Sequence, residues 1–133
     1  MPISKATLLS STQAYAPVFD GEIDHSAQIP INVTALTTAE VDSAGYLKPG
    51  VPFAKDGTTV GATDTVFGVS IEPIKVATGN SAGALSAASA AFEIGLGIAG
   101  VVKKALAETN LGRSYTADEI AGFAKAGCQI TLL

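Results

Sequence analysis

Residues 92–107 read FEIGLGIAGVVKKALA, and this stretch decides the fold class. Apolar residues occupy every second position from Phe92 to Ile98 and alternate with Glu93 and two glycines, which is the period of a β-strand. We expect a further strand over Val101–Leu106. Glycine inside a strand indicates a bulge or a place where another backbone comes close. The stretch therefore predicts a β-rich domain with unusually close backbone packing.

The same stretch contains Gly95-Leu96-Gly97-Ile98-Ala99-Gly100, which matches the G-x-G-x-x-G pattern of dinucleotide-binding loops. Such a loop opens an amphipathic helix, and an acidic residue ends the next strand about 20 residues later. Here two β-branched valines follow the glycines, and the acids Asp118 and Glu119 fall in the first turn of a predicted helix. The pattern favours a bulged strand, and a nucleotide-binding enzyme is the weaker alternative.

Towards the C-terminus, a helix and a closing strand are predicted. Thr116 and Glu119 form the Thr-x-x-Glu capping box that begins helices, and apolar residues follow at helical spacing. Gly127 is typical of a C-terminal stop. Residues 128–133 alternate with the strand period, so we expect this strand to be tied into a sheet.

Towards the N-terminus, the patterns predict short strands joined by turns. Residues 29–36 alternate, and Pro30 indicates an edge strand or a strand start because it has no backbone donor. Residues 38–57 contain so many turn signals that no helix is expected. Val66–Val76 has the strongest strand pattern in this half. We expect a single domain over residues 29–133. Within it, residues 77–91, ATGNSAGALSAASAA, predict a mobile or loosely packed connection.

Residues 1–28 show no clear period, and we expect an extended N-terminal arm. Pro17 favours extended backbone at the residue before it, and Asp20-Gly21 signals a turn. The arm is more apolar than a solvated tail should be, so we interpret it as a segment that orders on a partner, with a frayed terminus as the alternative. The residues proposed for this contact are Leu8, Leu9, Tyr15, Pro17, Val18 and Phe19.

Composition excludes several classes of function. The net charge is −4, with only 8 lysine and arginine residues, so neither nucleic acid nor an anionic membrane surface is an expected partner. Although 47% of the residues are hydrophobic, no run of 18 apolar residues predicts a membrane-spanning helix. One histidine and one cysteine favour a binding or structural module without cofactor or metal, in a reducing compartment.

The individual candidates for chemistry have simpler interpretations. His25 lies among turn residues, and no G-x-S-x-G motif supports a hydrolase. Asp20, Glu22 and Asp24 alternate like the start of a calcium loop, but the later glycine and glutamate positions do not fit, so a solvated acidic edge is favoured. Cys128 begins an apolar strand and is expected to be buried and inert.

The order of features carries a resemblance to a known family. An apolar-polar N-terminal arm is followed by an extended segment ending in Asp56-Gly57-Thr58-Thr59, a strand Val66-Phe67-Gly68-Val69, and a closing helix and strand over residues 120–130. In this order the chain resembles the lambda-type head decoration, or capsid stabilisation, proteins of tailed bacteriophages. The resemblance spans roughly residues 35–76 and 92–133, while the 77–91 segment looks like an insertion.

The resemblance implies both a fold and a function. The fold is α+β and β-rich, a small β-barrel-like or mixed sheet domain with a C-terminal helix, a closing strand and an N-terminal arm. The function is non-enzymatic: a homotrimer, made in the host cytoplasm, binds the major capsid protein on the outer surface of an expanded head and stabilises it against internal DNA pressure. A tail-associated or adhesive virion module is the alternative.

Overall fold

The computed structural model describes residues 15–133. In it, the stretch that decides the fold forms the 11-residue strand β6 and the beginning of the helix that follows. The strands are β1 (His25–Ile31), β2 (Tyr46–Leu47), β3 (Pro52–Phe53), β4 (Gly68–Ser70), β5 (Ile74–Lys75), β6 (Phe92–Val102) and β7 (Ile130–Leu132). The helices are the 3-10 turn η1 (Val33–Ala35), α2 (Ala82–Ser86), α3 (Lys104–Leu111) and α4 (Ala117–Ala124).

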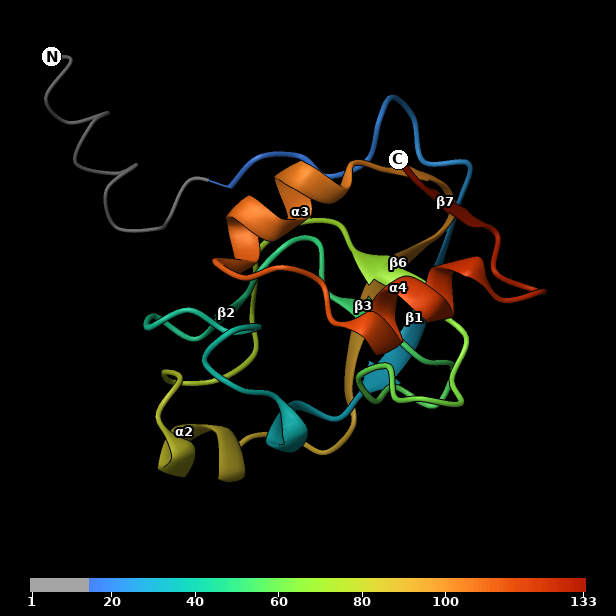
Figure 1. Ribbon diagram of the computed structural model, residues 1–133. Helices are drawn as coiled ribbons and strands as arrows, with labels where there is room; N and C mark the ends of the chain where they lie inside the picture. Colours follow the sequence, from blue (N-terminus) through green and yellow to red (C-terminus); the bar gives the residue numbers. More distant parts are fainter. Residues whose placement is uncertain (1–14) are drawn as a thin grey trace, which may run out of the picture.

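Within residues 15–133, five strands form one sheet in the order β1-β6-β4-β3, with β7 attached to β6 (Figure 1). The short strands β2 and β5 pair separately. β6 is antiparallel to β1 and β4 and parallel to β7. The α+β, strand-rich class is therefore confirmed. The sheet stays open, so the mixed sheet forms and the barrel-like form does not.

The predicted strand from Phe92 extends further than expected, and the separate strand over Val101–Leu106 is wrong. β6 continues to Val102, and α3 begins at Lys104. Lysine, alanine and leucine in KALAETNL are good helix formers, so the two valines end a strand rather than begin one. Gly112, at a φ of 71°, then ends α3 in the left-handed conformation that glycine adopts without strain.

The C-terminal predictions are confirmed in their main features. Both hydrogen bonds of the capping box form between Thr116 and Glu119 at the start of α4. The helix ends at Ala124, three residues before Gly127, and Lys125 takes extended backbone. Lys125 Nζ donates to the carbonyls of Ala62 and Asp64, at 2.9 and 3.0 Å. The chain then enters β7, which is tied into the sheet as expected.

In the N-terminal half, the predicted strands form but are shorter than expected. β1 is an edge strand, as Pro30 indicated, but it ends at Ile31, and Asn32 caps the 3-10 turn that follows. The Val66–Val76 pattern divides into β4 and β5 around Pro73.

The 77–91 segment is not a loosely packed connection at its centre. It contains α2, which Ser81 caps and whose Leu85 is buried. Asn80 Nδ2 also donates to the Val41 carbonyl at 3.0 Å. A buried leucine and an amide contact thus help to fix a segment composed mainly of small residues.

The core lies between the sheet and helices α3 and α4. Leu96 of β6 and Phe53 of β3 are completely buried, and α3 contributes Leu111. Phe123 of α4 stacks against Tyr115, with ring centroids 5.5 Å apart. The Tyr115 hydroxyl donates to the Gly50 carbonyl at 2.7 Å, so this buried phenol is satisfied.

A buried ion cluster fastens α4 to the first half of the chain. Arg113 Nη1 lies 2.8 Å from Glu119 Oε1, and its Nη2 lies 3.3 Å from Glu40 Oε2. The two glutamate side chains are only 4% and 7% exposed. The hydrogen bond to Glu119 raises the pKa of Arg113 above its ordinary value, against the opposing effect of burial. Arg113 thus neutralises two carboxylates that have almost no access to water.

Removing Arg113 should strongly destabilise the protein. We expect Arg113→Met to lower the free energy of unfolding by about 3–5 kcal/mol, because it leaves two buried carboxylates without a cation. The matched control is Lys104→Met, which breaks the more exposed Lys104–Glu108 pair (3.4 Å) and should cost less than about 1 kcal/mol. Urea denaturation measures both, and equal losses would contradict the assigned role of Arg113.

Candidate interaction surface

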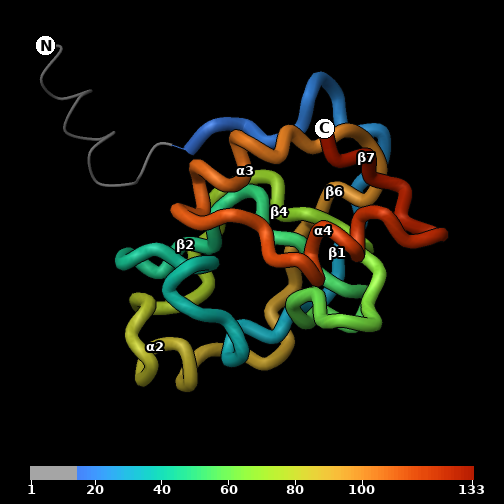
Figure 2. Tube along the Cα trace, in the orientation of Figure 1, coloured from blue at the N-terminus to red at the C-terminus, as the bar shows by residue number. Residues whose placement is uncertain are grey.

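The described part of the predicted arm is anchored in the domain itself. Residues 15–19, the anchor segment, run beside α3 and β6 (Figure 2). The Ala16 backbone makes two hydrogen bonds with the Asn110 side chain, at 3.0 and 2.8 Å. Lys103 N donates to the Val18 carbonyl at 2.8 Å. The anchor segment is therefore part of the fold.

Within the predicted arm of residues 1–28, this anchoring corrects the part from residue 15 to residue 28. Val18 is 1% exposed and lies in the core, so it is not available for an external contact as proposed. Phe19 is partly buried and packs against the core. Tyr15 donates to Asp42 Oδ2 at 2.7 Å, and burial is the main reason that its pKa is raised. Pro17 remains exposed. The other proposed contact residues, Leu8 and Leu9, lie outside the described residues.

The Phe19 ring occupies space that only glycine can leave open. A Cβ built on Gly97 would overlap this ring, and one on Gly100 would come within 3.2 Å of it. Phe19 also forms an isolated antiparallel bridge with Val102. A close neighbour is thus found at Gly97 and Gly100, but it is the Phe19 ring of the chain's own anchor segment and not the backbone that was predicted. The G-x-G-x-x-G residues lie within a strand and form no phosphate-binding loop at a helix start.

Gly97→Ala tests this anchoring. We expect it to lower the free energy of unfolding by about 1–3 kcal/mol, because the new methyl group collides with the Phe19 ring. In a Phe19→Ala background the same change should cost less than about 0.5 kcal/mol, since the obstacle is gone. Gly95→Ala is the matched control, because its Cβ would meet nothing within 4 Å. An equal cost of Gly97→Ala in both backgrounds, measured by denaturation, would contradict the contact.

Residues 20–24, the acidic turn, project from the domain beyond the anchor segment. Asp20 N donates to the Val101 carbonyl at 2.7 Å, and Asp24 N donates to the Ala99 carbonyl at 3.1 Å. The turn is therefore held at both ends by β6. Oδ1 of the Asp20 carboxylate lies 3.8 Å from Lys103 Nζ. Within residues 15–133, no group of three acidic, histidine or cysteine side chains is placed to hold a metal ion.

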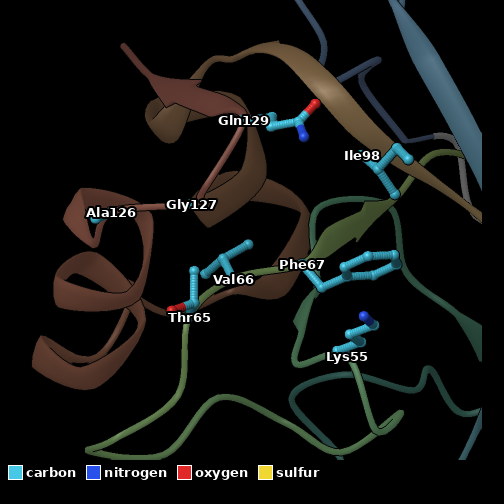
Figure 3. A pocket seen from close by; sticks show the side chains of 8 residues that line it. All are labelled: Lys55, Thr65, Val66, Phe67, Ile98, Ala126, Gly127 and Gln129. Carbon is cyan, nitrogen blue, oxygen red and sulfur yellow. The ribbon is translucent and has the colours of Figure 1, made fainter.

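A groove opens on the sheet near the end of α4, and sequence reasoning did not find it. We call it the Lys55 groove; it measures about 330 Å³ and is lined by Lys55, Thr65, Val66, Phe67, Ile98, Ala126, Gly127 and Gln129 (Figure 3). Its floor is apolar, from Val66, Phe67 and Ile98, and Lys55 and Gln129 contribute polar groups. Nothing in the local sequence links these positions; only the fold brings them together.

Two further sequence candidates have simple structural settings. His25 is exposed at the start of β1, where the register with β6 shifts. Cys128 is half-buried, and burial raises the pKa of its thiol. A raised pKa lowers the thiolate fraction, which is the reactive form. Cys128 is therefore less buried than expected, and its inertness stays a prediction.

No family model, curated protein or solved structure matches this chain. Between residues 15 and 133, no helix has the length and apolar character needed to cross a membrane.

Proposed function

We propose that this protein is a capsid decoration protein that binds the outer surface of an expanded phage head as a homotrimer and stabilises it against internal pressure. The proposal rests on the order of sequence features that resembles the lambda-type decoration proteins. It takes residues 1–14, including Leu8 and Leu9, as the segment that contacts the major capsid protein. The anchor segment and acidic turn have other roles, since they belong to the domain.

The observation that carries the proposal is the way the anchor segment joins β6. Its backbone pairs with the end of β6 through the Val18 carbonyl and the Phe19–Val102 bridge. β6 in turn pairs with β1, β4 and β7. A pull on residues 1–14 is therefore applied to the strand that connects the whole sheet. A protein that holds shell subunits together needs this kind of mechanical continuity between its contact segment and its core.

The exposed edge of the sheet also favours binding through backbone pairing. β1 is an edge strand, and its residues from His25 to Pro30 are exposed or half-buried. An open edge presents backbone donors and acceptors that can pair with a strand of another protein. Pro30 and the neighbouring turn limit this edge at one end, because Asn32 N donates to the Gly57 carbonyl at 3.0 Å. A strand from a shell subunit could extend the sheet along the remaining part.

Substitution at Leu8 and Leu9 tests the proposed contact segment. We expect the full-length chain with Leu8→Asp and Leu9→Asp to bind expanded capsids at least about tenfold more weakly, because the contact would have to bury two charges. Ser10→Asp with Ser11→Asp adds the same charge beside it and should retain most of the binding. Co-sedimentation with purified capsids measures both variants, and thermal melting checks that each remains folded. Unchanged binding of the leucine variant would refute the contact.

Electron microscopy of particles decorated with the purified protein separates the two virion functions. Decoration predicts density over the whole shell at three-fold and quasi-three-fold positions. Density confined to one vertex would instead support a tail-associated module. Absence of particle binding at any concentration would reject both.

A further inference from the structure

The ammonium group of Lys55, which lines the groove, has no partner among the described residues. Among the lysine and arginine side chains of residues 15–133, Lys55 alone has no hydrogen bond, ion pair or ring contact. Figure 3 shows its side chain beside the Phe67 ring, with Ile98 and Gln129 across the groove. An ammonium group next to an apolar floor suits a carboxylate that lies close to an aliphatic side chain. The groove therefore favours an acidic segment that also carries an aliphatic side chain.

The acidic turn has the complementary composition. Its residues Glu22-Ile23-Asp24 place one aliphatic residue between two carboxylates, and both acids are exposed. Within the described part of the chain, neither Glu22 nor Asp24 has a side-chain partner. The two backbone hydrogen bonds to β6 hold the turn in place, so little conformational entropy would be lost when it binds.

The turn and the groove of one molecule start from opposite faces of β6. Phe19, which leads into the turn, covers the face on which Gly97 lies. Ile98 of the groove lies on the other face, next to Leu96, where a Cβ on Gly68 would meet both side chains. The Phe19 ring that leads into the turn and the Ile98 side chain of the groove are thus on opposite sides of the sheet. A neighbouring copy can offer its groove instead.

We propose that the acidic turn of one copy binds in the Lys55 groove of the next, in a head-to-tail contact that closes the homotrimer. This inference rests on the trimer of the proposed function and names its contact. A head-to-tail contact forms a ring when the rotation between copies closes. In a ring of three, every turn fills a groove and every Lys55 ammonium meets carboxylates. The contact would pair opposite charges although the chain as a whole has a net charge of −4.

Charge reversal and its rescue test the contact in solution, without capsids. By analytical ultracentrifugation at low salt, the wild-type chain should sediment as a trimer. We expect Lys55→Glu to raise the dissociation constant of the trimer at least about tenfold, because like charges then face each other. Glu22→Lys with Asp24→Lys should do the same. All three changes in one chain should restore most of the association, since the charges are complementary again.

Matched controls exclude a general effect of net charge. Lys75→Glu makes the same change as Lys55→Glu at another exposed site, and Glu72→Lys with Glu93→Lys matches the change in the turn. Both controls should sediment like the wild type. A Lys55→Glu chain that remains a trimer, or no recovery in the combined variant while its melting curve is native, would overturn the proposal. A monomeric wild type would overturn it as well.

The capsid-binding experiments and the sedimentation experiment test two separate claims, so either claim can be refuted while the other stands. If the charge-reversal pattern appears but the trimer does not bind capsids, the contact stands and the decoration function is rejected. If Lys55→Glu abolishes capsid binding while the trimer persists, the groove receives a shell protein, and its assignment to a second copy is wrong.

Discussion

The whole structure depends on the backbone pairing of one glycine-rich strand. β6 holds β1 and β4 on its two sides, and near its end β7 and the anchor segment replace them. This crowding is possible because glycine leaves room for a neighbour's side chain. Gly97 accommodates the Phe19 ring, and Gly68 of β4 accommodates Leu96. A side chain at either position would push apart two elements that the hydrogen bonds of the sheet hold together.

Local patterns in the sequence predicted the local structure well. The capping box of α4 depends on residues three positions apart, and the alternation from Phe92 to Ile98 reflects the pleat itself, so both are visible in the sequence. The end of β6 and the start of α3 were misjudged because Val101 and Val102 favour a strand while the residues after them favour a helix. A boundary between two opposing preferences is decided by packing.

Contacts between distant residues could not be predicted in the same way. The apolar content of Val18 and Phe19 was a valid signal that they are buried, but nothing local indicated against what. Their partner, the end of β6, lies far along the chain, so an external partner was an equally consistent interpretation. The Lys55 groove could not be predicted either, because it too is formed by residues that are distant in sequence. Lys55, Phe67 and Gln129 come from three separate segments, and each looks unremarkable in its own surroundings.

The pairing of β1 with β6 has a consequence for the nascent chain. β1 ends at Ile31, and its partner strand begins only at Phe92. Contacts between residues so far apart in sequence slow folding, because a long loop must close before the contacts are gained. During synthesis the first two thirds of the chain therefore emerge from the ribosome without their central strand. The domain can assemble only after residues 92–102 have been synthesised, and until then the open edge of β1 is exposed to other chains.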